Sequence, residues 1–479
     1  MEYWISQRWL CAAGLVGAGL LTGCTNLAPP ATTPAVATTA QWAGAAAAGW
    51  IKTDARPHWQ TTRWWELFND PVLNGLAAQV DVNNQNLALA TANVAQAEAL
   101  LRAAEAGLFP TLGAQAGDQR GGRPTHSSVS LGLDASWAPD VWGSIADSIR
   151  AQGANVQASV ADLAAARLSA QGGMTQAYFG LREADAEGAL LDDIIAGYER
   201  AEQITRNSYQ AGIAPHTDLL QAQGTLESAR ATRAALAASR TTFEHAIALF
   251  VGKAPADFKL AAAPWKFDIP AIPDVLPSEL LLRRPDIAAA ERSVVAANAR
   301  IGVARAAYFP SFGLSASLGG SAATLSTLAS APVLAWSLGL SAAQTLFDGG
   351  ARGAAVDQAR ALHDAATATY RQTALTAFGQ VEDQLTALGT LATQIDHTRA
   401  AAAAATGAET RILNSYRAGI SAYTDVITAQ ATALSTRRSV LQLELQRQQA
   451  AVSLIQALGG GWQAPWAASP GTAENKTAS

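Results

Sequence analysis

The chain has 479 residues and a formal net charge of −5. This acidic balance, with no basic run and no basic stripe among aromatic residues, argues against a nucleic-acid partner. Two cysteines lie near the N-terminus and six histidines are scattered, so the sequence contains neither a disulfide framework nor a metal-ligand cluster. We therefore expect no catalytic site, no metal and no cofactor apart from any covalent lipid.

The first 23 residues have the features of a bacterial lipoprotein signal peptide. Arg8 precedes an apolar run over residues 9–21, which is too short for a usual transmembrane helix. The run leads into Leu-Thr-Gly-Cys at Cys24, which resembles a lipobox, where the cysteine becomes the lipidated first residue of the mature chain. We therefore expect a lipid such as palmitate on Cys24; an ordinary signal peptide with an incidental cysteine is the alternative. Thr25, in place of the aspartate typical of inner-membrane lipoproteins, implies sorting to the outer membrane.

Residues 24–60 are rich in alanine, threonine and proline, a composition typical of a flexible tether. Aromatic residues between positions 61 and 70 then indicate the start of folded structure. A helix is predicted over residues 82–108, because this stretch is rich in alanine, leucine and glutamine and is stopped by Pro110.

The pattern then changes from helical to alternating. Over residues 128–137 apolar and polar side chains alternate strictly, which predicts a strand with one apolar and one polar face. Residues 111–116 alternate less cleanly, and a loop over 121–124 separates the two strands. A second pair of strands is predicted over 311–318 and 336–342. The apolar face then contains Leu131, Leu133, Leu314 and Leu338, and the polar face contains Ser130, Asp134, Ser315 and Ser337.

Two long helices are predicted over residues 144–210 and 350–417, each on the order of 100 Å long at about 1.5 Å per residue. Shorter helices are predicted over 218–250, 285–308 and 425–457. Each half of the chain thus contains a helix, two strands, a long helix, a turn and a further helix. The order of elements indicates that the chain is internally duplicated.

One segment occurs twice, at residues 207–230 and 414–437. At an offset of 207 residues, 13 of the 24 aligned positions are identical, which supports the duplication. In each copy a glycine, Gly212 or Gly419, lies where a helix ends and favours a left-handed closing turn. Thr-Asp follows in each copy, where short polar side chains cap the free N–H groups of the next helix. Each copy is therefore predicted to be the tip of a helical hairpin.

Four strands per chain cannot close a barrel, and an open sheet with an apolar outer face leaves its edges unpaired. Closure requires several chains, with eight strands from two copies or twelve from three. The small serine and glycine residues of the polar face cannot fill a twelve-strand lumen, so that barrel would hold water. A lipid anchor, a shared barrel and helices of this length together predict a tunnel that crosses the periplasm.

Motifs along residues 20–460 resemble the TolC-like outer membrane factor family, and most closely its NodT/OprM-like lipoproteins of RND-type efflux systems. In chain order they are the lipobox at Cys24, Trp64-Trp65, Asp70-Pro71, Leu276-Pro277-Ser278, Arg284-Pro285-Asp286-Ile287, Phe309-Pro310, Leu346-Phe347-Asp348-Gly349-Gly350 and the two Ala-Gly-Ile tips. The resemblance implies a mixed fold, in which a trimeric twelve-strand membrane β-barrel adjoins a long α-helical coiled-coil barrel. The expected parts are a first repeat at 61–250, an equatorial linker at 251–284, a second repeat at 285–458 and a C-terminal tail at 459–479.

The resemblance also implies a periplasmic gate at the hairpin tips. Its residues would be Asp425, Asp218, Tyr416 and Tyr209. Asp425 falls on a ring of carboxylates that constricts the channel, and the other three fall in or beside links between tips. The family's second constricting aspartate and its linking arginine are replaced here by Thr428 and Ser421. Plain helix capping is the alternative role for both aspartates.

The implied function is that of a passive exit duct for drugs or other small compounds. A homotrimer in the outer membrane would receive them from a periplasmic adaptor and an inner-membrane RND-type pump. Adaptor contact is expected at Gly212, Ile213, Gly419 and Ile420, because a turn requires the glycines but not exposed isoleucines. An outlet for type I protein secretion is one alternative, and a coiled-coil lipoprotein without a pore is another. Met1 and Met174 are the only methionines, so a thioether relay for copper is not indicated.

Overall fold

The structure is a computed structural model that describes residues 27–30, 32–38, 42–43, 63–122, 126–270, 281, 283–328 and 334–466. The predicted signal peptide and Cys24 lie outside these ranges, as does the end of the predicted tail. The chain divides into two compact units. Unit 1 contains Met1–Ala35, Ala92–Val160 and Ala289–Gln372, and unit 2 contains Val36–Thr91, Ala161–Ala288 and Thr373–Ser479.

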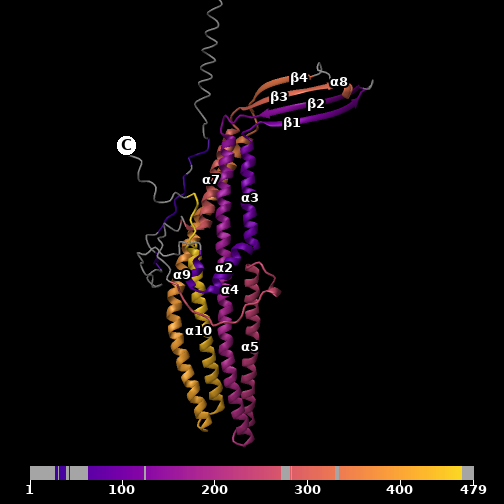
Figure 1. Cartoon of the computed structure of the whole chain (residues 1–479). Helices are drawn as coiled ribbons and strands as arrows, with labels where there is room; N and C mark the ends of the chain where they lie inside the picture. The colour runs from indigo at the N-terminus through magenta and orange to yellow at the C-terminus, as the bar shows by residue number, and fades with distance from the viewer. Residues whose placement is uncertain are drawn as a thin grey trace, which may run out of the picture. The chain divides into compact units, whose positions relative to one another are not determined.

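Helices make up most of the described chain (Figure 1). The two longest, α4 (Ser144–Gln210) and α9 (Ala351–Arg417), have 67 residues each, which confirms the predicted long helices. The others of more than one turn are α2 (Pro71–Asn83), α3 (Gln85–Ala106), α5 (His216–Phe250), α7 (Pro285–Ala306) and α10 (Tyr423–Ala457). Short helical turns are η3 (Trp64–Phe68), η4 (Pro255–Asp257) and α8 (Leu325–Leu328). Among the described helices, none combines the length and the apolar character that a membrane span requires.

The stretch predicted as one helix over residues 82–108 contains the last residues of α2 and all of α3, which are separated by Asn84. The amide of Asn84 donates to the carbonyl of Phe250 at 3.0 Å, and its side-chain oxygen accepts from the backbone of Asn86 at 3.0 Å. Asn84 therefore ends one helix and caps the next. The start of α2 was not predicted, although Asp70 caps it by accepting from Val72 at 2.9 Å and proline occupies its first turn.

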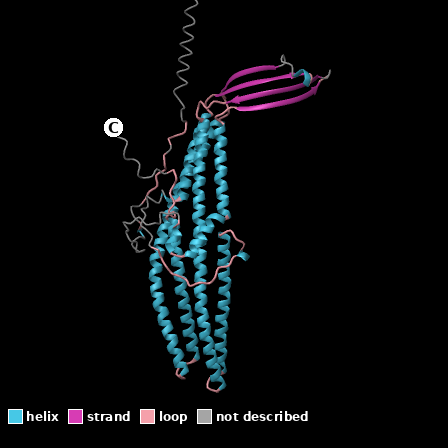
Figure 2. Ribbon diagram, in the orientation of Figure 1, coloured by secondary structure: helices cyan, strands magenta, loops and turns pink. Residues whose placement is uncertain are grey.

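The described strands form one antiparallel sheet within unit 1, in the order β1-β2-β3-β4 (Figure 2). They are β1 (Thr111–Gly121), β2 (His126–Trp137), β3 (Ser311–Ala322) and β4 (Leu334–Ala343). Each strand is longer than predicted. Gly121, which was expected in a loop, is the last residue of β1, because it pairs with His126 of β2.

The register of the sheet separates apolar from polar side chains. Directly paired residues of an antiparallel sheet share a face, and so do residues two apart along a strand. Leu133 of β2 pairs with Leu318 of β3. One position along, Asp134 pairs with Ser317, and Ser317 pairs with Ser337 of β4, with the two hydroxyl oxygens 2.9 Å apart. The predicted division into an apolar and a polar face is therefore confirmed.

The segment predicted as a flexible tether is docked where the structure describes it. In unit 1, Asn298 of α7 donates to the carbonyl of Pro29 at 2.8 Å, and Arg305 of α7 donates to that of Leu27 at 3.0 Å. In unit 2, Trp42 is 6% exposed and packs edge-on against Phe378. The prediction of a free tether is wrong for these residues, because side-chain donors from α7 satisfy the carbonyls of Leu27 and Pro29 and an aromatic contact buries Trp42.

Candidate functional site

The two hairpin tips have the same backbone geometry, which confirms the predicted closing turns. Gly212 and Gly419 both have φ of 72°, in the left-handed region that glycine adopts without strain. In each tip the amide after the glycine donates to a carbonyl five residues back, at 2.8 Å in the first tip and 2.9 Å in the second. These bonds close the last turns of α4 and α9.

Each tip presents one apolar side chain to solvent. Ile213 and Ile420 are both 80% exposed, so neither contributes to the core of its own chain. A Cβ atom added at either tip glycine would meet no heavy atom within 4 Å. The glycines are thus required by the turn, whereas nothing in the turn requires the isoleucines.

The two tip aspartates lie inside the first turns of helices and not at their caps. α5 begins after Pro215 and α10 begins after Ala422, and neither cap residue has a side-chain acceptor. The capping role considered for Asp218 and Asp425 is therefore wrong. The reason is that both helices start two residues earlier than predicted, so the aspartate amides already donate to the cap carbonyls at 3.2 Å. Both carboxylates lie where the helix dipole favours negative charge.

The second tip packs against the first hairpin within unit 2. Tyr423, 3% exposed, and Val426 of α10 form a buried cluster with Ala222 of α5, and Tyr416 of α9 packs against this cluster. The two tyrosine rings lie edge to face with centroids 5.1 Å apart. Tyr423 was not among the expected gate residues, although it aligns with the aromatic His216 at the offset of the repeat.

The structure brings two of the expected gate residues, Tyr416 and Asp218, close together in one chain. The Tyr416 hydroxyl is buried and has no hydrogen bond of ordinary geometry among the described residues. Burial raises the pKa of Tyr416, the neighbouring Thr205 hydroxyl lowers it in part, and the Asp218 charge raises it again. Burial also raises the pKa of Tyr423 to about 12. Both phenols therefore stay neutral and able to donate to a carboxylate.

The corresponding pair in the first tip is exposed. The rings of Tyr209 and His216 lie 4.9 Å apart with an interplanar angle of 37°. Tyr209 is 40% exposed and His216 is also exposed. Asp425, at the start of α10, is exposed as well. The structure thus groups Tyr416 with Asp218 and leaves Tyr209 and Asp425 open to solvent.

Thr428 and Ser421 occupy the positions where an aspartate and an arginine were expected. The Thr428 hydroxyl donates to the carbonyl of Thr424 at 2.9 Å, and the Ser421 hydroxyl donates to that of Ile412 at 3.3 Å. Both hydroxyls are therefore used within their own hairpin, and neither supplies a charge to the tip.

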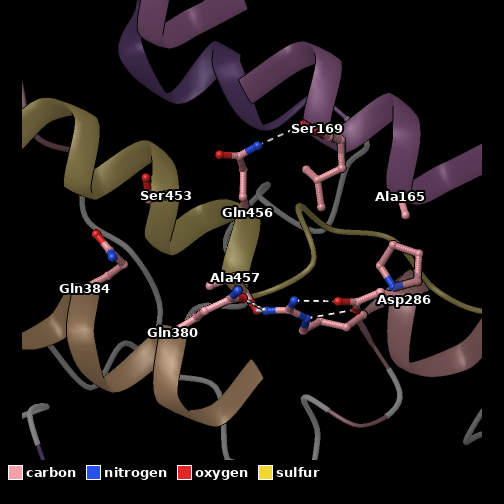
Figure 3. Close-up of a pocket in the computed structure, with 11 residues that line it drawn as sticks. Ala165, Ser169, Asp286, Gln380, Gln384, Ser453, Gln456 and Ala457 are labelled. Atoms are coloured by element: carbon pink, nitrogen blue, oxygen red, sulfur yellow. Dashed lines mark hydrogen bonds and ion pairs between the residues drawn. The ribbon is translucent and has the colours of Figure 1, made fainter. Parts of the chain in front are cut away.

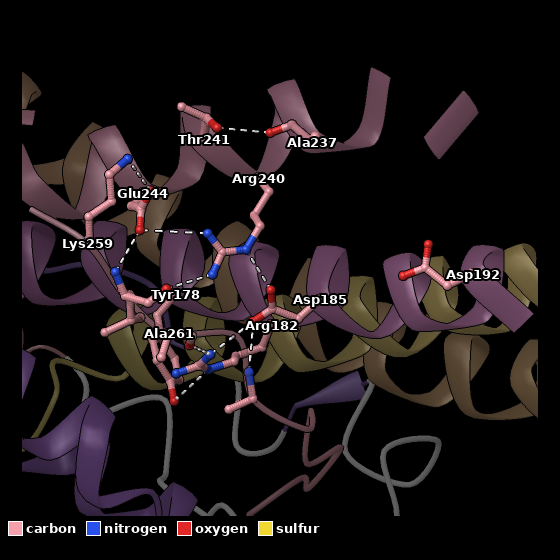
Figure 4. A network of polar contacts seen from close by, with 12 residues as sticks. Tyr178, Arg182, Asp185, Asp192, Ala237, Arg240, Thr241, Glu244, Lys259 and Ala261 are labelled. Carbon is pink, nitrogen blue, oxygen red and sulfur yellow. Dashed lines mark hydrogen bonds and ion pairs between the residues drawn. The ribbon is translucent and has the colours of Figure 1, made fainter. Parts of the chain in front are cut away.

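A network of charged side chains anchors part of the predicted equatorial linker within unit 2 (Figure 4). Asp185 of α4 accepts from Arg240 of α5 at 2.6 Å and from Arg182 of α4 at 3.0 Å. The same two arginines donate to linker carbonyls, Arg240 to Leu260 at 2.7 Å and Arg182 to Ala261 at 2.9 Å. Because the carboxylate and both guanidinium groups are largely buried, the linker is fixed by paired charges.

A cavity of about 410 Å³ in unit 2 is lined by Arg284 together with glutamine and serine side chains (Figure 3). Arg284 makes two contacts with Asp286, at 3.0 and 2.6 Å, and donates to Gln380 at 2.9 Å and to the carbonyl of Ala457 at 3.1 Å. The guanidinium is fully engaged in joining chain segments. Among the described residues, no cluster of three or more His, Cys, Asp or Glu side chains could hold a metal ion.

The sequence matches the family model described as Outer membrane efflux protein over residues 76–253 and 276–460. Similar curated proteins include the Cation efflux system protein CusC of Escherichia coli O6:H1, which is 29% identical over 92% of this chain and 97% of the relative. The Pyoverdine export outer membrane protein OpmQ of Pseudomonas aeruginosa is 31% identical over 94% of this chain and 96% of the relative.

Solved structures share the fold along nearly the whole chain. The outer-membrane channel OprN aligns with a TM-score of 0.83 at 29% identity, covering 91% of this chain and 99% of that one. The open state of the MtrE outer membrane channel of Neisseria gonorrhoeae aligns with a TM-score of 0.80 at 28% identity, covering 91% of this chain and 98% of that one. The family match spans both repeats, so the chain belongs to the outer membrane efflux protein family.

Proposed function

We propose that three copies of this outer membrane efflux protein form the passive exit duct of a tripartite pump, which carries small compounds from an adaptor and an RND-type inner-membrane pump to the outside. The observation that carries the proposal is the likeness to outer membrane channels over 91% of this chain. The named relatives serve efflux or export, which favours this function over protein secretion.

The sheet supports a barrel shared by three chains. Among the described strands, β1 and β4 each have one open edge, and these two strands run antiparallel to each other across the four-strand order. β4 of one copy can therefore continue the sheet at β1 of the next, and three copies give twelve strands. The apolar face, which contains Leu133, would contact lipid, and the serine-rich face, which contains Asp134, would line a water-filled lumen.

A lipid on Cys24 would attach the chain to the outer membrane in addition to the barrel. A single acyl chain alone anchors a protein only weakly, so the barrel would supply the second attachment. This covalent lipid is the one non-protein group that we propose. Met174 is fully buried, so it cannot serve as a thioether ligand on a transport path, and a dedicated relay for copper is not supported.

The tips would form the periplasmic gate. Three copies of Asp425 would converge near the symmetry axis. Their carboxylates would repel one another and attract cations. Links such as Tyr416 with Asp218 would hold the tips together against this repulsion. The exposure of Asp425 and the closeness of Tyr416 and Asp218 support these roles.

The exposed isoleucines support adaptor docking at the tips, and efflux in living cells tests it. Cells that contain an adaptor and an RND-type pump but lack their outlet should regain dye efflux when this chain is supplied. Ile420→Glu should abolish the gain, because a charge replaces an apolar contact, whereas Ile420→Leu should retain it. Equal amounts of trimer in the outer membrane would exclude a folding defect. Full efflux by the Glu variant would show that Ile420 contacts no partner.

A further inference from the structure

Within unit 1, the loop that leaves β2 packs against the start of β3. The ring of Trp142, in the loop between β2 and α4, stacks on Phe309 with centroids 4.7 Å apart and an interplanar angle of 23°. Its indole N–H donates to the carbonyl of Pro310 at 2.6 Å. Trp142 and Pro310 are both half-buried. The seam between β2 and β3 is therefore closed at this end by an aromatic contact between the two halves of the duplicated chain.

The corresponding loop of the second half lies between β4 and α9, and it presents apolar side chains to solvent. Like the first loop, it leads directly into a helix of 67 residues. Gln344 at its start donates to a backbone carbonyl at 3.0 Å, and Asp348 near its end pairs with Arg352 at 2.6 Å. Between these two attachments lie Leu346 and Phe347, which are 91% and 89% exposed. The loop is thus fixed on both sides of an apolar pair that its own chain leaves uncovered.

The start of β1 repeats the start of β3 but is not covered in the same way. Phe109-Pro110 matches Phe309-Pro310 at an offset of 200 residues. Phe109 is 67% exposed against 39% for Phe309, and Pro110 is exposed where Pro310 is half-buried. Leu112, the second residue of β1, is also exposed. One of the two Phe-Pro strand starts is therefore packed within the chain and the other is left open.

The exposed loop and the open strand start lie at opposite edges of the sheet and at the same end of it. Among the described strands, β1 and β4 are the two edges. Ala343, the last residue of β4, pairs with Ser311, the first residue of β3, while Thr111, the first residue of β1, pairs with Ser136 near the end of β2. In a barrel that several copies share, the loop after β4 would therefore adjoin the start of β1 in the next copy. The loop after β2 adjoins the start of β3 in the same manner.

We infer that Leu346 and Phe347 of one copy pack on Phe109 and Pro110 of the next copy and close the seam between β4 and β1. The inference rests on the proposed trimer, in which seams inside chains alternate with seams between copies. A second copy is the occupant, since the chain already places a loop aromatic on a Phe-Pro strand start at its internal seam. The contact would remove two large apolar side chains of each loop from water, which favours closure of the barrel.

The contact between copies would differ from the internal one in one respect. At the offset of 207 residues Trp142 corresponds to Gly349, and the ring of the second loop lies two residues earlier, at Phe347. Phenylalanine has no donor, so the carbonyl of Pro110 would not receive the bond that Pro310 receives from the indole. Beside the strand hydrogen bonds, the seam between copies would thus be held by apolar packing alone.

Cysteine cross-linking tests the contact directly. The natural cysteines fall in the predicted signal peptide and at the predicted lipidation site, so introduced thiols have no other competitor in the mature chain. Purified channel with Phe347→Cys and Phe109→Cys, treated with a short bifunctional thiol reagent, should give covalent dimers and trimers on a denaturing gel. The matched internal pair, Trp142→Cys with Phe309→Cys, should cross-link without an increase in mass. Each single variant should stay monomeric on the gel.

Charge substitution separates a second copy from lipid as the occupant. Phe347→Glu should lower the temperature at which the trimer dissociates, and adding Phe109→Lys should restore part of that loss because opposite charges then meet across the seam. Leu325→Glu, at a side chain that is 72% exposed beyond the other end of β3, is the control and should leave the dissociation temperature unchanged. A loss that Phe109→Lys deepens would show that Phe347 contacts lipid, and would overturn the inference.

The mass of the detergent-solubilised complex distinguishes failure of the inference from failure of the proposed function. A trimer whose internal pair cross-links but whose inter-copy pair does not would overturn the inference and leave the proposed function standing. A monomeric wild-type chain would remove the proposed function itself. If the phenylalanine variants fail to assemble, Leu346→Cys with Leu112→Cys provides the same test at the neighbouring side chains, with the same two outcomes.

Discussion

At the scale of single residues, α4 carries two neighbouring carboxyl groups that are both buried in unit 2. Glu183 and Glu187 lie one turn apart and are both buried, and Arg438 of α10 donates to Glu187 at 2.6 Å. Burial raises the pKa of Glu183 to about 7, and the charge of Glu187 contributes further. One arginine thus faces two carboxyl groups, and in the folded state Glu183 holds its proton below a pH of about 7.

This pair predicts a pH dependence of stability. The folded pKa of Glu183 lies above its unfolded value of 4.5, so the stabilisation is present below pH 4.5 and is lost as pH rises through about 7. After allowance for partial solvation, the loss should be roughly 1–2 kcal/mol. In the purified channel, Glu183→Gln should make the midpoint temperature of unfolding less dependent on pH between 4.5 and about 7. Glu199→Gln, at an exposed ion pair on the same helix, is the control. An unchanged pH profile in Glu183→Gln would show that another group titrates.

At the scale of elements, the periodic segments could be predicted from sequence and their junctions could not. The helices follow from composition and from glycine and proline stops, and the strand faces follow from alternation; both are local information. The break at Asn84 depends on an acceptor 166 residues away, the carbonyl of Phe250. The two helix starts at the tips were misplaced because Thr-Asp resembles a cap, while the chain is already helical there. The burial of Tyr423 depends on contact with Ala222, which no local pattern reveals.

The two faces of the sheet should differ in how well they tolerate a charged substitution. Leu133→Arg places a charge on the face that we assign to lipid and should cost about 2–4 kcal/mol near mid-membrane. Ser130→Arg, on the same strand and the opposite face, should be tolerated because its side chain would reach water. The yield of folded trimer in outer membranes and its unfolding in urea report the difference. Equal losses for both variants would mean that the faces are assigned wrongly.

At the scale of the whole molecule, the duplication bears on both the proposed assembly and the proposed gate. Two like hairpins per chain would give the proposed trimer six tips around one symmetry axis. Tyr416 and Asp218 would lie within that ring, and burial keeps the phenol of Tyr416 neutral. A contact between the neutral Tyr416 phenol and the Asp218 carboxylate would open without breaking a buried ion pair, and an adaptor that binds the open tips more tightly would favour the open state.

The central claim is that the chain forms a channel that is closed at its tips, and single-channel current in planar bilayers tests it most directly. Wild-type protein should insert and show a low resting conductance. Tyr416→Phe combined with Asp218→Ala should raise that conductance severalfold, because the proposed link between the tips loses both the Tyr416 hydroxyl donor and the Asp218 carboxylate acceptor. Tyr198→Phe, a buried tyrosine elsewhere on α4, should leave it unchanged. Absence of any channel current, or a resting conductance in the double variant equal to that of wild type, would contradict the account.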